Sequence, residues 1–249
     1  NNHSSMFSGV LRNNAWGTGP VGLTKVGSGT LSLTGPDDYS GASTVSNGEL
    51  VISTAFIGAG NFFVNGGATL GVTNLSGASA LVSNLTFAAG AALDFQNVSS
   101  ASTPLATANN VQLGGSCAVK ISGAGGLAAN NRYPLIGYGG GLSGFTNLQL
   151  QMPYGWRGEL AMDAGQVVLT NVAVVATDPP QLNAAFSNGL LQLGWPADHI
   201  GWRLQTQTNS LIAGLGSNWT DVANASSVDQ LVLPVNPING YVFYRLVYP

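Results

Sequence analysis

The sequence predicts an all-β protein in which a β-solenoid is followed by a small β-sandwich. Three observations lead to this prediction. A phrase of glycine, spacer and alternating apolar residues recurs along the first two thirds of the chain, and each copy is bounded by Gly, Asn or Ser. Apolar faces at helical spacing are lacking, and glycine every few residues would cost about 1 kcal/mol each inside a helix.

The recurring phrase sets the spacing of the predicted strands. It reads GTLSL at 29–33 and returns as GELVI at 48–52. The leading apolar residues of successive copies are 19, 20, 23 and 26 residues apart, at Leu31, Leu50, Leu70, Leu93 and Val119. We predict inward-facing stacks, formed by Leu31, Leu33, Leu50, Ile52, Leu70, Val72, Leu93 and Phe95.

Short strands at a steady interval could build a sandwich, a barrel or a solenoid. The near-identical phrases favour a solenoid, because each coil then lays its aliphatic residues on those of the coil before. One coil cannot bury its own apolar face, so stacking is obligatory.

The stretch at 23–53, LTKVGSGTLSLTGPDDYSGASTVSNGELVIS, resembles the autotransporter-associated β-strand repeat. The matching residues are Leu23, Thr24, Lys25, Gly27, Gly29, Thr30, Leu31, Leu33, Gly35, Tyr39, Gly41, Thr44, Val45, Gly48 and Leu50. The resemblance implies a right-handed parallel β-helix in a large secreted or surface-displayed bacterial protein. It also implies structural, adhesive or display roles, with no catalytic residues. One full copy is present, and the coils that follow it are degenerate.

The composition of the chain changes after a run of Asp178, Pro179 and Pro180: the segment that follows is rich in Trp and lacks the glycine-led phrase. We predict a solenoid at 1–176, a stiff linker at 177–180 and a small β-sandwich at 181–249. Sandwich strands are expected at 182–186, 190–195, 202–206, 219–222, 228–233 and 241–247, with hairpin turns at 187–189 and 239–240. This segment is similar to the fibronectin type III-like modules of large secreted bacterial proteins, in which an inner Trp and a Tyr-x-Arg strand are characteristic.

Charge is the unusual feature of the composition. Charged residues make up 7% of the chain against about 25% in an average domain. With a net charge of −3 there is no cationic stripe, so we expect no nucleic-acid partner. No apolar run is long enough to span a bilayer, and no signal peptide is visible at the start. The single cysteine, Cys117, excludes an internal disulfide framework and is read as a buried thiol.

Catalytic and metal-binding patterns are weak. His3 and His199 are the only histidines, and they lack metal-ligand spacing. The adjacent Asp37 and Asp38 could bind calcium, but such a pair in a Gly-Pro-Asp turn usually caps the turn. The other carboxylates are scattered singly. We therefore expect no enzyme activity, no metal and no cofactor.

Aromatic residues are the stronger binding candidates. Tyr154, Trp156 and Arg157 lie in a turn-like segment, where flat rings beside polar groups would suit sugar rings. The alternative is that Trp156 plugs the end of the solenoid or packs against the sandwich. Trp195 and Trp202 flank the turn at His199; one is expected in the sandwich core, and Trp202 could serve as a surface platform for a polysaccharide.

The N-terminal end of the solenoid has no visible cap. Met6, Phe7, Val10 and Leu11 form an apolar set with one nearby charge, Arg12. An uncapped end exposes unpaired backbone groups, and a head-to-tail contact that does not close makes a filament. We expect residues 1–14 to take part in self-association.

These expectations combine into one functional hypothesis. It is a non-catalytic structural or adhesive protein of the bacterial surface or the extracellular space, self-assembling head-to-tail. Its signal or precursor segment is expected to lie outside this chain, which opens as if inside a repeat. The alternative is a carbohydrate-binding module or a glycan-binding adhesin.

Overall fold

The chain folds into two units. The computed structural model describes residues 2–13, 19–75, 77–99, 102–210, 212–236 and 240–248. Unit 1 consists of Asn1–Pro153 and Gly158–Val172, and unit 2 of Tyr154–Arg157 and Ala173–Pro249. In the described residues, regular structure is almost entirely β, and helix is confined to three short 3-10 turns.

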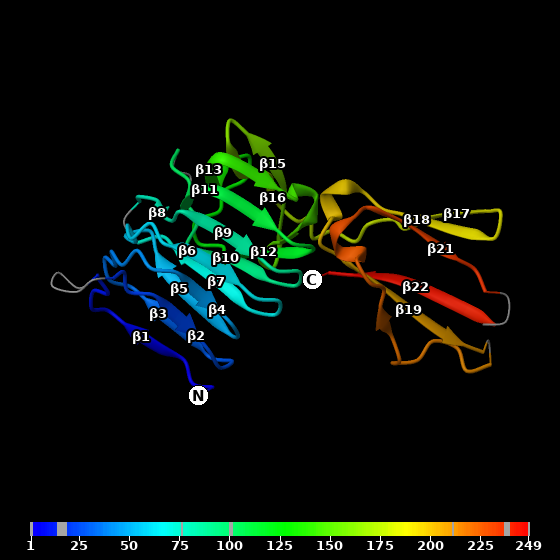
Figure 1. Ribbon diagram of the computed structural model, residues 1–249. Helices are drawn as coiled ribbons and strands as arrows, with labels where there is room; N and C mark the ends of the chain where they lie inside the picture. Colours follow the sequence, from blue (N-terminus) through cyan, green and yellow to red (C-terminus); the bar gives the residue numbers. More distant parts are fainter. Residues whose placement is uncertain are drawn as a thin grey trace. The chain divides into compact units, whose positions relative to one another are not determined.

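Unit 1 contains two large sheets, which we call sheet A and sheet B (Figure 1). Sheet A has, in spatial order, β1 (Ser5–Phe7), β3 (Thr30–Leu33), β5 (Glu49–Ser53), β7 (Thr69–Thr73), β10 (Ala92–Gln96), β12 (Cys117–Ser122) and β14 (Leu148–Gln151). Sheet B has, in spatial order, β2 (Leu23–Lys25), β4 (Ser43–Val45), β6 (Asn61–Val64), β9 (Asn84–Phe87), β11 (Ala106–Leu113), β13 (Tyr133–Ser143), β16 (Gln166–Val174) and β15 (Trp156–Asp163). The short β8 (Ala80–Leu81) pairs with β11, and the 3-10 turn η1 (Phe145–Asn147) precedes β14.

Up to β14 the chain runs through sheet A and sheet B in turn. We call the stretch from one strand to the next strand of the same sheet a passage, so each strand pairs with the strand one passage earlier. All the sheet A pairings are parallel. Their register places Leu50 beside both Leu31 and Leu70, and Leu93 beside Leu70 and Val119. The intervals of 19, 20, 23 and 26 residues in the sequence are therefore the intervals between paired strands.

The core of unit 1 lies between the sheets. Seven of the eight residues predicted to form inward stacks are buried, and Leu31, near the β1 end, is half-buried. Tyr39, Phe56 and Phe62 fill the interior beside these stacks, with edge-to-face ring contacts at centroid distances of 5.2 and 5.5 Å. The inward stacks are confirmed.

The outer face of sheet B carries an asparagine ladder. Asn61, Asn84 and Asn110 occupy the same register on β6, β9 and β11. The Asn84 amide donates to Asn61 at 2.8 Å, and the Asn110 amide donates to Asn84 at 2.9 Å. In-register neighbours thus satisfy one another without charge.

Parallel pairing in sheet B ends at β13. The next strand in that sheet, β16, pairs with β13 in the antiparallel direction, with a register shift between Pro134 and Ile136. The turn between β15 and β16 holds Ala164 and Gly165 at φ of 47° and 76°, the left-handed region that a tight hairpin requires. The two ends of unit 1 are therefore different.

Unit 2 consists of two three-stranded antiparallel sheets (Figure 1). One sheet contains β17 (Asn183–Ser187), β18 (Leu190–Gly194) and β21 (Gln230–Pro234), and the other contains β20 (Thr220–Asp221), β19 (Arg203–Asn209) and β22 (Tyr241–Val247). The 3-10 turns η2 (Ala197–His199) and η3 (Ala225–Ser227) lie between strands. Leu193, Trp195 and Leu204 form the buried centre of a core that both sheets share.

The predicted strands of unit 2 agree with the observed ones to within a few residues. The expected hairpin at 187–189 is present: Asn188 and Gly189 have φ of 53° and 77°, and Ser187 pairs with Leu190. The second expected hairpin includes Asn239, which lies outside the described residues.

The large parallel sheets are consistent with a β-helix-like fold, and the all-β prediction is confirmed. Within the described ranges, none of the helices has the length and apolar character needed to cross a membrane.

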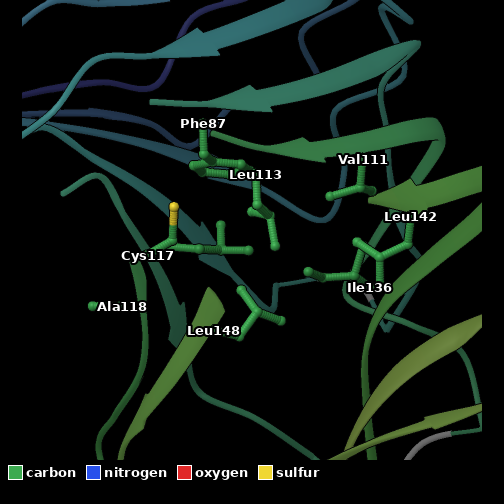
Figure 2. Close-up of a pocket in the computed structure, with 9 residues that line it drawn as sticks. Phe87, Val111, Leu113, Cys117, Ala118, Ile136, Leu142 and Leu148 are labelled. Carbon is green, nitrogen blue, oxygen red and sulfur yellow. The ribbon is translucent and has the colours of Figure 1, made fainter. Parts of the chain in front are cut away.

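A small cavity interrupts the core where the passages lengthen. Paired positions Cys117 and Leu148 on β12 and β14 are 31 residues apart, the longest interval in sheet A. The volume within the cavity that the centre of a water-sized sphere can occupy is about 10 Å³. Its lining is apolar and comprises Phe87, Leu93, Val111, Leu113, Cys117, Ala118, Ile136, Leu142 and Leu148. Figure 2 shows side chains from both sheets pointing into this space. A cavity without polar partners has nothing to orient a polar ligand.

Filling this cavity should stabilise unit 1. Val111→Ile adds one methylene at the lining, and we expect a gain of up to about 0.8 kcal/mol in unfolding free energy. Val119→Ile is the matched control, because Val119 is fully buried in the close-packed stack. There the same methylene should cost about 1–3 kcal/mol. Chemical denaturation measures both, and equal effects of the two substitutions would contradict the difference in packing.

Candidate functional site

The stretch at 23–53 supplies a buried cation to the turns of unit 1. Lys25 ends β2 and is 7% exposed. Its Nζ donates to the carbonyl oxygens of Val26 at 3.0 Å, Gly27 at 2.7 Å and Asn47 at 3.1 Å. The ammonium thus joins the turn after β2 to the turn after β4, one passage later. The sequence marks Lys25 only as a motif match, because the Asn47 carbonyl, 22 residues along the chain, becomes its neighbour only on folding.

Two glycines of the stretch are required by local geometry. Gly48 has φ of 66°, and a Cβ there would lie 2.8 Å from the Lys25 Nζ. Gly41 has a different reason: a Cβ there would collide with the backbone of Val21, one passage earlier. Both glycines allow one passage to approach the next.

The GPDDYSG turn binds the passage before it. The Asp37 carboxylate accepts the Leu11 amide at 2.6 Å, and the Asp38 amide donates to the Leu11 carbonyl at 3.0 Å. Burial raises the pKa of Asp37, the Leu11 hydrogen bond lowers it, and the charge of Asp38 raises it, with a net upward shift. Burial likewise raises the pKa of Tyr39 to about 12, although its hydroxyl is hydrogen-bonded to Ser43. These groups support the fold and are poorly placed for chemistry with a solute.

The expected self-association residues lie on and beside the terminal strand of sheet A. Met6 is 73% exposed and Phe7 40%, while Val10 is exposed and Leu11 is half-buried. Phe7 is in register with Leu33 at the end of an inward stack. The β1 strand is paired with the chain's own β3, and its other edge has no strand partner in the described ranges.

The four expected carbohydrate-binding residues all belong to unit 2, but they differ in exposure. Tyr154 is 69% exposed, and its ring meets Tyr248 edge-to-face at 5.6 Å. Trp156 and Arg157 are half-buried at the start of β15. Trp202 is 6% exposed and cannot act as a surface platform.

The burial of Trp202 has a clear cause. Its indole N–H donates to the Ala176 carbonyl at 2.8 Å, and its ring contacts His199 and Tyr248. Trp195 is also buried, in the shared core of the two sheets. The sequence pattern predicts that one of Trp195 and Trp202 lies in the core, and in the structure both are buried.

Two carboxylates approach each other on the outer face of sheet A. Gln96 Nε2 lies 3.5 Å from Glu49 Oε1 and 3.2 Å from Asp94 Oδ2. Burial raises the pKa of Glu49, the hydrogen bond from Thr30 lowers it, and the charge of Asp94 raises it. Ser122 donates to the other Asp94 oxygen at 2.5 Å. Both carboxylates are thus occupied by neighbours on adjacent strands.

Metal and thiol chemistry find little support in the described residues. No group of three or more His, Cys, Asp or Glu there could hold a metal ion. Asp37 and Asp38 contact the backbone of Leu11 instead. Cys117 is buried, and burial raises the pKa of its thiol, which disfavours the reactive thiolate.

A family model, the passenger-associated-transport-repeat, matches residues 23–52. This supports the resemblance to the autotransporter-associated repeat and coincides with the stretch that contains Lys25, Asp37, Tyr39 and Gly48. No curated protein matches the chain. The family match ends before unit 2, so the fibronectin type III-like resemblance of the C-terminal segment gains no support from it and stays a prediction.

The Lys25 ammonium should be a major stabilising contact of unit 1. Lys25→Met keeps the apolar stem but leaves three carbonyl oxygens without their donor, so we expect a loss of at least about 2 kcal/mol in unfolding free energy. Arg132→Met is the control, because Arg132 is an exposed cation whose ion pair with Asp163, at 2.6 Å, lies at the surface of unit 1. Its loss should cost under about 1 kcal/mol. Thermal unfolding followed by circular dichroism compares them; a Lys25 variant as stable as the Arg132 variant would remove this role.

Proposed function

We propose that this chain is a non-catalytic structural element of a secreted or surface-displayed bacterial protein, built on a right-handed parallel β-helix. One observation carries the proposal: the residues of the matched repeat are used to join one passage to the next. Lys25, Asp37 and Gly41 each contact backbone of an adjacent passage. Such an element supplies length and stiffness.

The family match supports the location. A passenger-associated repeat suggests a secreted or surface location, and the neutral, Asn-rich outer face of sheet B is compatible with it. The occupied carboxylates and the buried thiol support a role without catalysis.

Self-association would use the β1 end of unit 1. Sheet A is parallel throughout, so β14 of one copy could pair with β1 of the next and continue the sheet in the same direction. The exposed Phe7 would then be covered as the inward stack continues. Sheet B ends in antiparallel strands at the far end, so the head-to-tail contact would run through sheet A.

Charge placed at this end should prevent association. We expect the unaltered chain to self-associate with rising concentration, and Phe7→Lys to raise the dissociation constant at least about tenfold. Phe63→Lys is the matched control: Phe63 is 41% exposed, much like Phe7, but lies on the central strand β6. Sedimentation velocity over a concentration series gives the constants.

Two results would count against this contact. One is an unaltered chain that stays monomeric at the highest concentration. The other is equal weakening by both lysine substitutions, which would indicate a general effect of charge.

A second candidate function, glycan binding, is favoured by Tyr154. Its exposed ring is supported by Tyr248, which in turn packs on the buried Trp202. A rigid, exposed aromatic face can cover the apolar C–H face of a sugar. Trp156 and Arg157, half-buried nearby in the sequence, would contribute at its border.

Loss of the Tyr154 ring tests this candidate. If unit 2 binds polysaccharide, Tyr154→Ala should weaken retention on insoluble polysaccharides at least about tenfold. Tyr241→Ala is the control, since Tyr241 is 50% exposed on β22, outside this aromatic group. Absence of binding by the unaltered chain across a glycan panel, or equal losses in both variants, would exclude a site at Tyr154.

A further inference from the structure

A short connector, which we define as residues 176–180, is held on unit 2 by hydrogen bonds around one turn. The Ala176 amide donates to the Asp198 carbonyl at 3.0 Å, and Trp202 Nε1 donates to the Ala176 carbonyl at 2.8 Å. His199 Nε2 lies 2.7 Å from the Asp178 carbonyl oxygen. Just before the connector, Val175 is fully buried and contacts Gly201. The turn at η2 therefore fixes the path of this segment of unit 2 ahead of β17.

His199 is the central residue of this attachment. It is 3% exposed, and it is one of only two histidines in the chain. Its Nδ1 lies 2.7 Å from the Asp198 carboxylate, and its Nε2 faces the Asp178 carbonyl. Both ring nitrogens thus face oxygen atoms that accept hydrogen bonds.

This geometry favours one protonation state. A neutral imidazole carries one N–H, so one of its nitrogens would direct a lone pair at an acceptor oxygen. The imidazolium donates from both nitrogens and satisfies both oxygens. The charge-assisted bond to the Asp198 carboxylate favours the neutral tautomer with its N–H at Nδ1, so deprotonation removes the hydrogen bond from Nε2 to the Asp178 carbonyl. The imidazole is buried, so water cannot replace that bond without opening the structure.

The surroundings of the ring agree with this conclusion. The charged groups that face it, within the described ranges, are Asp198 from its own turn and Asp178 from the connector, whose Oδ1 lies 3.8 Å from Nε2. The Trp202 ring lies 5.4 Å away, and Tyr248 packs on the other side of Trp202. Burial lowers the pKa of His199, but the Asp178 carbonyl and the Asp198 carboxylate raise it, and the net shift is upward from 6.5.

We propose that protonated His199 is a pH-sensitive latch that holds the connector on the η2 turn, and that its deprotonation loosens residues 176–180. Because Val175 before the connector and β17 after it both belong to unit 2, the loosening is a local opening within that unit. This inference is independent of whether the protein forms filaments or binds glycans.

The direction of the pH dependence follows from linkage. The folded pKa lies above the unfolded value of 6.5, so the stabilisation is complete below about pH 6.5. It is lost as the pH rises through the folded pKa. Between the two values, the closed-to-open ratio of the latch should fall by up to about tenfold per pH unit.

Hydrogen exchange of the full chain tests the latch. The protection of the Ala176 amide, corrected for intrinsic exchange, should fall by up to about tenfold per pH unit above about pH 6.5. His199→Gln, which is neutral at every pH, should show low protection that does not change with pH. His3→Gln is the matched control, because His3 is exposed and lies in unit 1; it should behave as the unaltered chain does.

A second measurement keeps the proposal falsifiable if His199→Gln fails to fold. With only two histidines, His3→Gln leaves a single imidazole resonance, and its titration by NMR gives the pKa of His199 directly. Asp198→Asn should lower that pKa and move the loss of Ala176 protection to lower pH. A His199 pKa at or below 6.5, or Ala176 protection that is flat with pH in the unaltered chain, would overturn the latch.

Discussion

Parallel pairing between each strand and the strand one passage earlier is the constraint on which unit 1 depends. A single passage buries little, so each must lie against its neighbours along its whole length. This close approach excludes a Cβ at Gly41, which faces the backbone of Val21. It also brings carbonyl oxygens of successive turns together at Lys25, where one ammonium satisfies three of them. The stretch at 23–53 thus places a glycine where two passages approach closely and a lysine where carbonyl oxygens of successive turns meet.

The inward stacks could be predicted from the sequence because the spacing of the apolar residues is visible in the chain itself. Leu31, Leu50, Leu70 and Leu93 could be aligned from their spacing, and the register pairs them in that order. The partners of polar groups could not be read in the same way. The sequence leaves Trp202 as a candidate platform, whereas in the fold its indole N–H donates to the Ala176 carbonyl. Lys25 and His199 likewise contact backbone oxygens that the sequence pattern does not mark. Exposure of Tyr154 likewise depends on the rings beneath it.

The asymmetry of unit 1 explains why its two ends should behave differently. At the β1 end the parallel stack stops at the exposed Phe7, which pairs with Leu33. Toward β14 the passages lengthen, a cavity opens beside Cys117, and sheet B turns to antiparallel pairing at β16. A regular, unpaired parallel edge invites another strand, whereas the change of direction at the far end stops parallel growth of sheet B. Any assembly through unit 1 should therefore be directional.

The same stacking disfavours charge on the sheets of unit 1. Residues in register on adjacent parallel strands lie about 4.8 Å apart, so a charged residue repeated in every passage would face its own like charge. Neutral amides avoid this and can hydrogen-bond along the stack, as Asn61, Asn84 and Asn110 do. Where charge does occur on sheet A, Asp94 stands beside Lys120 in the register, and Gly71 separates it from Val51 on the other side. In-register stacking thus disfavours repeated charge in unit 1, whereas in unit 2, with its irregular turns, a single protonation at His199 can alter structure.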